Sequence, residues 1–200
     1  MAELLEADVD PDPVRQFGRW FEEAQQAGIR VPEAMAVATA TPEGRPSVRM
    51  VLLKGYDERG FVFYTCYESR KGRELAENPR AALLFHWDTL GRQVRVEGAV
   101  ERLPPAESDA YFVSRPRGSR LSAVASRQSE LVPGRETLDA RVTELAATVG
   151  EAGPERPDWW GGYRVVPDSF ELWQHRDDRL HDRLRYRRSG DAWIVERLAP

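Results

Sequence analysis

Basic and hydroxyl side chains gather at several places in the sequence where they could bind an anion. The first is Ser69-Arg70-Lys71, at the predicted start of a helix. The free amide groups and the dipole of a helix already make its N-terminus positive, so two cations there are unfavourable unless an anion lies among them. Phosphate is the usual anion at such a position. The alternative is that both side chains extend into water.

A second cluster combines Tyr111, Arg115 and Ser119. Tyr111 and Arg115 are four residues apart on one predicted helix face, and Ser119 follows a predicted glycine turn. A phenol, a guanidinium and a hydroxyl together suit a phosphate monoester, which carries close to two negative charges at neutral pH. An exposed Tyr–Arg pair is also common, so the spacing alone leaves both interpretations open.

The segment Arg49–Lys54 is predicted to be an apolar strand with a cation at each end. Because side chains alternate along a strand, Arg49 and Lys54 point to opposite faces. Arginine dominates the basic residues of this chain, and its only lysines are Lys54 and Lys71. A compact ammonium group at these positions could serve a specific contact, or the lysines could be there by chance.

The segment 179–183 (R-L-H-D-R) has the sharpest pattern. If it is extended, Arg179, His181 and Arg183 point to one face. Cationic or titratable neighbours repel one another unless an anionic or electron-rich ligand lies against them, and histidine can donate, accept and change charge near neutral pH. The alternative is a surface strand whose arginines pair with neighbouring aspartates.

Composition limits the possible classes of protein. The 200 residues carry a formal net charge of −4, which offers no footprint for nucleic acid, and the apolar stretches are too short to span a membrane. The single cysteine, Cys66, excludes an internal disulfide, and the acidic start is unlike a signal peptide. We therefore expect a cytoplasmic protein, with residues 1–12 as a flexible acidic segment and residues 13–200 as one domain.

Familiar catalytic motifs are absent from the sequence. His86, His175 and His181 are scattered and Cys66 is alone, so no metal site is predicted. The chain has no P-loop, no G-x-G-x-x-G and no G-x-S-x-G motif. Clusters suited to phosphate, without a strong nucleophile, favour a reaction driven by a cofactor.

Hydrophobic periodicity predicts a mainly β (α+β) fold. Period-2 patterns and turn residues predict strands at 34–41, 47–54, 61–65, 81–87, 93–103, 163–166, 170–173, 184–188 and 192–198. Helical spacing and capping residues predict helices at 13–27, 69–78, 105–114 and 135–149. Short turns between strands, with helices inserted among them, indicate an antiparallel barrel decorated by helices.

A series of short motifs resembles the pyridoxine (pyridoxamine) 5′-phosphate oxidase family, in order and spacing, over nearly the whole chain. The motifs are R-M-V-L-L-K (49–54), F-Y-T (63–65), S-R-K-G (69–72), R-Q-V-R-V-E-G (92–98), Y-F-V-S-R-P (111–116), S-R-Q-S (126–129), W-W-G-G-Y-R (159–164), W-Q (173–174), R-L-H-D-R-L (179–184) and E-R-L-A-P (196–200). The resemblance implies a six-stranded antiparallel split β-barrel of Greek-key character, dimerising through its C-terminal strands. The implied homodimer binds two FMN molecules at the subunit interface.

The resemblance also implies the site residues. It implies FMN contacts from Arg49, Met50, Val51, Leu52, Lys54, Tyr64, Thr65, Arg70, Lys71, Gln93, Gln128, Ser129, Trp173 and Arg183. It implies substrate contacts from Lys54, Tyr111, Arg115, Ser119, Arg179 and His181. In this scheme Arg179 and His181 are catalytic and lie over the pyridine ring of the substrate, while Lys54 and the residues of the second cluster hold the substrate phosphate.

The implied reaction oxidises pyridoxamine or pyridoxine 5′-phosphate to pyridoxal 5′-phosphate, with O2 as the electron acceptor and H2O2 as a product. Family members usually have an Arg- and Tyr-containing segment before the first helix that folds over the substrate, whereas residues 1–12 contain neither residue type. Alternatives are a related FMN oxidase of phenazine biosynthesis, a deazaflavin-dependent reductase on the same barrel, and a non-catalytic flavin- or pyridoxal-phosphate-binding module.

Overall fold

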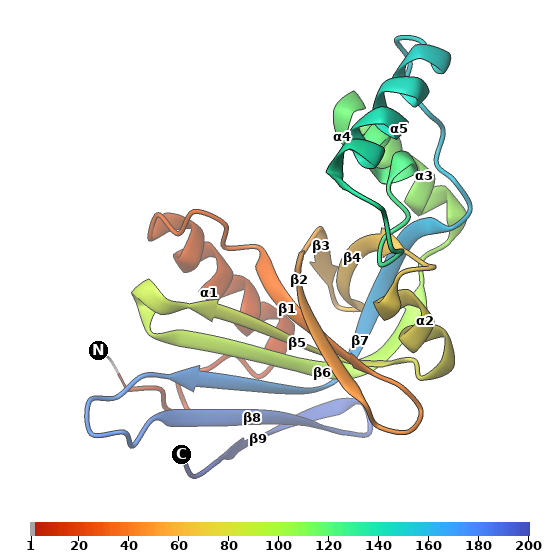
Figure 1. Ribbon diagram of the computed structural model, residues 1–200. Helices are drawn as coiled ribbons and strands as arrows, with labels where there is room; N and C mark the ends of the chain where they lie inside the picture. The colour runs from red at the N-terminus through yellow and green to blue at the C-terminus, as the bar shows by residue number, and fades with distance from the viewer. Residues whose placement is uncertain (1–2) are drawn as a thin grey trace.

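The computed structural model describes residues 3–200, whose strands form one antiparallel sheet that bends into a split barrel (Figure 1). The strands are β1 (Ala34–Ala40), β2 (Pro46–Leu52), β3 (Gly55–Asp57), β4 (Gly60–Cys66), β5 (Arg80–Trp87), β6 (Arg92–Arg102), β7 (Trp160–Gln174), β8 (Asp182–Ser189) and β9 (Ala192–Arg197). They pair in the order β2-β1-β5-β6-β7-β4-β3, and β8 joins β7 to β9. Because β2 approaches β4 without pairing with it, the six strands from β2 to β4 enclose a core and leave the barrel split. The predicted split barrel is confirmed.

Strand β7 is longer than predicted. We expected two strands, at 163–166 and 170–173, separated by a turn. The structure has one continuous strand, whose first half pairs with β4 and whose second half pairs with β8. The register between β6 and β7 shifts at a bulge beside Gly98 of β6. A Cβ atom on Gly98 would lie 1.9 Å from the carbonyl oxygen of Val166. Only glycine permits so close an approach of two backbones.

Helix α1 (Pro13–Gln26) packs against the core of the barrel. Asp12 caps it, because its Oδ1 accepts a hydrogen bond from the amide of Val14 at 2.8 Å. Phe17 is fully buried, with its ring centroid 4.8 Å from that of Phe61 and 4.9 Å from that of Phe85. These aromatic contacts hold α1 on the barrel. The helix predicted at 13–27 is confirmed, and it ends at Gln26.

The remaining helices are α2 (Arg70–Glu77), the short 3-10 helix η1 (Asp88–Leu90), α3 (Pro105–Ser114), α4 (Arg117–Ala125) and α5 (Arg135–Thr148). Helices α3 to α5 form an arm that projects from the barrel (Figure 1). Helix α4 was not predicted, because Pro116 and Gly118 suggested a turn. Pro116 instead stands at the N-cap, so Ser119 lies within a helix and not after a turn. None of the helices within residues 3–200 combines the length and apolarity needed to cross a membrane.

The acidic segment before α1 packs against the sheet, in contrast to the expected flexible extension. Leu4, Val9 and Asp10 are buried, and the hydroxyl of Tyr186 in β8 donates to the carbonyl oxygen of Asp10 at 2.8 Å. Arg197 of β9 donates to the carbonyl oxygen of Leu4 at 2.7 Å. The first two residues of the predicted flexible segment lie outside the described residues. Apolar side chains interspersed among the acids explain why the rest is ordered.

Candidate functional site

A cleft of about 600 Å³ lies between the barrel and the helical arm. Its walls come from β2, β4, α2, α3 and α4. The predicted site residues that line it are Met50, Val51, Leu52, Lys54, Tyr64, Thr65, Lys71, Tyr111, Arg115, Ser119 and Gln128. Most residues of the predicted flavin set and of the predicted substrate-phosphate set therefore share one cavity, although they come from distant parts of the sequence.

The start of α2 brings a group of predicted flavin residues together. The Nζ atom of Lys71 donates to Thr65 Oγ1 at 3.0 Å and to Gln128 Oε1 at 3.2 Å. The amide of Arg70 donates to Ser129 Oγ at 3.1 Å. Burial lowers the pKa of Lys71, and the nearby charge of Arg49 lowers it further. A bound anion would relieve this repulsion, so the site suits phosphate better than it suits a neutral ligand.

Arg115, between α3 and α4, is the cation that the helical arm contributes to the lining of the cleft. Its guanidinium lies over the ring of Trp160, 4.9 Å from the centroid, and its Nη1 atom is buried with no hydrogen-bond partner among residues 3–200. Burial lowers the pKa of Arg115. A buried guanidinium nitrogen without an acceptor is costly, and an anionic ligand in the cleft would satisfy it. Tyr111, Ser119 and Lys54 line the same cleft and could supply further donors.

A second, separate pocket holds half of the remaining predicted residues, whereas Arg49, Arg70, Ser129 and Arg179 line neither pocket. Its lining is Leu84, Gln93, Arg95, Trp173, His181, Arg183 and Pro200. Gln93, Trp173 and Arg183 are in register across β6, β7 and β8. Arg183 is held by Glu171, with Nε 2.8 Å from Oε1, and by the carbonyl oxygen of Ala199. A single chain therefore does not bring these residues into the first cleft.

The prediction that residues 179–183 are extended is wrong for the first half of this segment. Strand β8 begins at Asp182, and residues 175–181 form a turn, so Arg179, His181 and Arg183 do not share a strand face. The turn is closed by a hydrogen bond from the amide of Arg176 to Nδ1 of His181, at 3.1 Å. The His181 ring lies against Trp173, with the centroids 4.6 Å apart, while Arg179 is exposed.

Ser129 and Arg179 share an unusual backbone conformation. Their φ angles are 72° and 61°, and no other non-glycine residue within 3–200 has a positive φ. This conformation is unfavourable for residues with a Cβ atom and is concentrated at functional sites, where the surrounding structure holds it in place. Both residues belong to the predicted site.

The predicted set of site residues lacks several residues of the cleft, although Trp160 and Ser126 lie within the family motifs. Trp160, Ser122 and Ser126 line it, together with Gly118 and Ala123. The spacing of Ser119, Ser122 and Ser126 by three and four residues is a signal that could have revealed a hydroxyl face on α4. Glu74 was also missed, because a lone glutamate in a helix has no pattern that separates a buried carboxylate from a solvated one. Within residues 3–200, no cluster of His, Cys, Asp or Glu side chains is arranged to bind a metal ion.

The fold is shared with a known flavin-binding structure. A pyridoxamine 5′-phosphate oxidase-related, FMN-binding protein from Nostoc punctiforme superposes with a TM-score of 0.75, covering 94% of this chain and 98% of that chain, at 16% sequence identity. At this identity the likeness defines the fold class, an antiparallel split β-barrel.

Sequence comparisons define the family. The family model described as pyridoxamine 5′-phosphate oxidase matches residues 21–149, and that described as the pyridoxine 5′-phosphate oxidase C-terminal dimerisation region matches residues 160–200. A pyridoxine/pyridoxamine 5′-phosphate oxidase from Rubrobacter xylanophilus is 60% identical, with 100% of this chain and 92% of that protein covered. One from Paraburkholderia phymatum is 57% identical, covering 97% and 92%. The chain belongs to the pyridoxamine 5′-phosphate oxidase family, which confirms the resemblance.

A further structural relative has a different name and ligand. PhzG from Burkholderia lata, solved in complex with tetrahydrophenazine-1-carboxylic acid, superposes with a TM-score of 0.92 at 37% identity. The alignment covers 99% of this chain and 98% of that chain. The family and its oxidase class are established for this chain, and relatives in this family differ in the compounds they are named for or bind.

Proposed function

We propose that this protein is an FMN-dependent oxidase that converts pyridoxamine 5′-phosphate and pyridoxine 5′-phosphate to pyridoxal 5′-phosphate, with O2 as acceptor and H2O2 as product. With the amine, water hydrolyses the imine that oxidation produces, and ammonia is released. The observation that carries the proposal is the buried, unpartnered Nη1 atom of Arg115, in a cleft that Lys54, Tyr111 and Ser119 also line. This donor set suits a phosphate monoester, because charge-assisted bonds from a guanidinium and an ammonium offset the desolvation of the dianion.

The residues at the start of α2 fit the phosphate of FMN. Arg70 and Lys71 flank that helix start, with Ser129 and Gln128 beside them. When bound, FMN supplies the hydride acceptor for the oxidation. The protein's part is to hold the substrate carbon at reacting distance from the flavin ring and to neutralise two phosphate groups at separate places.

The second pocket completes the site in a homodimer. The matched C-terminal dimerisation region supports a dimer, and β2 exposes the apolar side chains of Val48, Met50 and Leu52. We propose that the partner copy covers this strand and brings its own Trp173 and Arg183 to the flavin. Arg179 and His181 would then orient the substrate ring and stabilise charge that develops on it. In the neutral imidazole, Nδ1 of His181 accepts a hydrogen bond, so Nε2 carries the proton and can donate to the substrate.

A turnover assay tests this proposal. The purified protein, loaded with FMN, is given pyridoxamine 5′-phosphate or pyridoxine 5′-phosphate with and without oxygen, while aldehyde and peroxide are measured. We expect aldehyde formation with stoichiometric oxygen uptake. Flavin binding without turnover of either compound would refute the oxidase and favour a non-catalytic binding module.

A phenazine-precursor oxidase is the second candidate, favoured by the similarity to PhzG. A tricyclic carboxylic acid does not require the donor set of Lys54, Tyr111, Arg115 and Ser119, so we rank this function second. A competition experiment distinguishes the two functions. Inorganic phosphate should inhibit turnover of a phosphorylated substrate by competing for Arg115, whereas a preference for a tricyclic dihydro compound would support the second candidate.

A further inference from the structure

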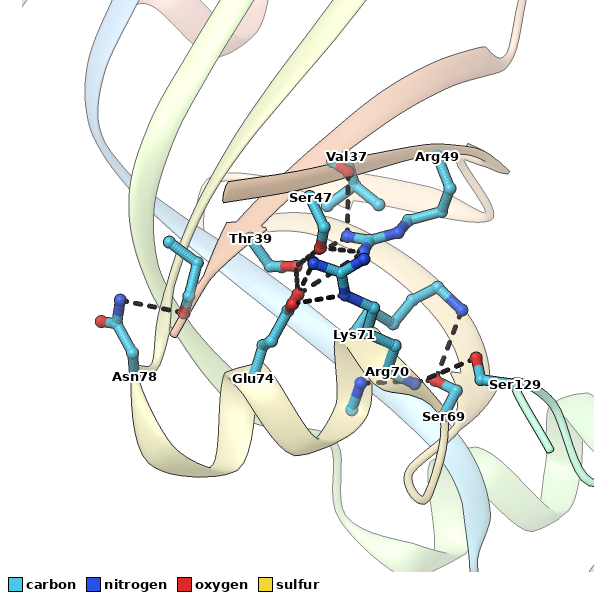
Figure 2. Close-up of polar contacts among 12 residues, drawn as sticks. Val37, Thr39, Ser47, Arg49, Ser69, Arg70, Lys71, Glu74, Asn78 and Ser129 are labelled. Atoms are coloured by element: carbon cyan, nitrogen blue, oxygen red, sulfur yellow. Dashed lines mark hydrogen bonds and ion pairs between the residues drawn. The ribbon is translucent and has the colours of Figure 1, made fainter. Parts of the chain in front are cut away.

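Glu74 is a buried carboxylate at the centre of a polar network between α2 and the strands β1 and β2 (Figure 2). Its Oε1 atom accepts a hydrogen bond from Nε of Arg70, one helical turn earlier, at 2.9 Å. Its Oε2 atom lies 3.5 Å from Nη2 of Arg49. One carboxylate thus contacts two arginines that belong to the proposed flavin-phosphate site and come from different elements.

Two hydroxyl groups bridge Glu74 to Arg49. Thr39 and Ser47 each donate a hydrogen bond to Oε2 of Glu74. Each hydroxyl also accepts from Arg49, with Nη1 donating to Thr39 Oγ1 at 2.6 Å and Nη2 donating to Ser47 Oγ. Arg49 Nη1 further donates to the carbonyl oxygen of Val37 at 3.2 Å. Because an ionised carboxylate can only accept, both hydroxyls donate to Glu74, and their oxygen atoms are left to accept from Arg49.

This network holds together cations that repel one another. Burial lowers the pKa of Arg49, the charge of Glu74 and its hydrogen bond raise it, and the charge of Arg70 lowers it. Burial also lowers the pKa of Lys71, and the charge of Arg49 lowers it further. Burial alone would raise the pKa of Glu74, but the hydrogen bonds from Ser47, Thr39 and Arg70 outweigh it and lower the pKa to about 2. Glu74 is thus ionised at neutral pH, and its side chain is only 5% exposed, so its charge is poorly screened.

We propose that Glu74 is a positioning residue for the phosphate end of the flavin site: it holds Arg49 through Thr39 and Ser47, and Arg70 directly, in the orientation that receives the flavin phosphate. This inference rests on the proposed FMN dependence. Glu74 does not itself contact the phosphate in this scheme. It reduces the cost of keeping the cations together before the ligand binds, which is preorganisation of a charged site.

The test compares FMN with riboflavin, the same ring system without the phosphate. Flavin is removed from the full-length protein, and both affinities are measured by fluorescence titration for the wild type and for Glu74→Gln. The amide places a donor where the carboxylate accepts from Thr39, Ser47 or Arg70. We expect FMN affinity to fall about tenfold while riboflavin affinity is unchanged, because bonds to charged groups contribute on that order.

The matched control is Glu77→Gln, which removes the same charge from an exposed position of the same helix. It should leave the ratio of FMN to riboflavin affinity unchanged. Equal loss of both affinities in Glu74→Gln would show a merely structural role and overturn the inference, as would an unchanged ratio.

A second variant keeps the test decisive if Glu74→Gln does not fold. Ser47→Ala removes one of the two bridges without changing any charge, and we expect it to lower the FMN-to-riboflavin ratio by a smaller factor. An unchanged ratio in Ser47→Ala would overturn the inference on its own. If the wild type itself fails to bind FMN more tightly than riboflavin, the proposed function fails instead, so the two failures are distinguishable.

Discussion

The phenol rings of Tyr64 in β4 and Tyr111 in α3 are stacked, with their centroids 3.9 Å apart and their planes 17° apart. Trp160 extends this stack, 5.6 Å from Tyr64 and nearly parallel to it. The sequence predicts Tyr64 as a flavin residue and Tyr111 as a substrate-phosphate residue. Their contact therefore links the two proposed halves of the cleft through one aromatic wall that fastens the helical arm to the barrel.

We expect Tyr111→Ala to lower the free energy of unfolding by about 3 kcal/mol, since it removes a large half-buried ring and its stacking partner contact. Tyr111→Phe keeps the ring and should change stability by less than about 1 kcal/mol. It should still raise KM for the phosphorylated substrate several-fold, because the hydroxyl donor is lost. Urea unfolding and steady-state kinetics check both variants; equal stability of the two would show that the stack contributes nothing.

Arg115→Ala should reduce kcat/KM for pyridoxamine 5′-phosphate by about 10- to 100-fold, the range expected for loss of hydrogen bonds to a charged group. Flavin content should stay at the wild-type level, because we assign Arg115 to the substrate phosphate and not to the flavin. The control substrate is pyridoxamine, which lacks the phosphate. If turnover of pyridoxamine falls by the same factor, Arg115 supports the fold of the cleft and does not recognise phosphate.

Val48→Asp should weaken the dimer and release flavin together. Val48 is 67% exposed in the described chain and lies beside Met50 on the outward face of β2, where the proposed partner packs. A charge in an apolar interface costs several kcal/mol if it is desolvated. Light scattering and flavin absorbance measure the two effects. Val31→Asp, at an exposed position before β1, is the control and should change neither.

His181→Ala and Arg179→Ala should each lower kcat about 10- to 100-fold, as expected for loss of an oriented donor that acts on developing charge. FMN affinity should remain within about twofold of the wild type, because neither residue is assigned to the flavin. Rapid mixing without oxygen, with flavin reduction followed by absorbance, measures the transfer of hydride from substrate to flavin separately from reoxidation. Release of flavin from either variant would move that residue into the cofactor site.

The network around Glu74 predicts how stability depends on pH. The folded-state pKa is about 2, below the ordinary value of 4.5, so ionised Glu74 stabilises the folded state at neutral pH. This contribution is complete above the ordinary value and is lost progressively as pH falls toward the folded-state value. Urea unfolding of the flavin-free protein between about pH 6 and about pH 3 should show a smaller loss of stability for Glu74→Gln than for the wild type. Parallel curves for the two proteins would contradict the prediction.

The sequence by itself determined most of the strands, helix α1 and the phosphate-suited clusters, because these depend on local periodicity, capping and residue type. It also carried the family motifs that identify the class of enzyme. Its errors lie where particular contacts, which hydrophobic periodicity does not encode, decided the path of the backbone. Strand β7 continues past a turn signal because Gly98 allows β6 to bulge against it. Residues 175–181 turn because His181 accepts a bond from the amide of Arg176.

Only the tertiary structure decided which clusters share a cavity. It placed the predicted flavin and substrate-phosphate residues of β2, β4, α2 and α3 in one cleft, and Trp173 and Arg183 in another pocket. It also revealed the role open to Glu74, whose partners Thr39 and Ser47 lie far away in the sequence. Such contacts depend on the pairing of β1 with β2 and the packing of α2 against them. No local pattern encodes that packing, because it is set by the burial of side chains from the whole barrel.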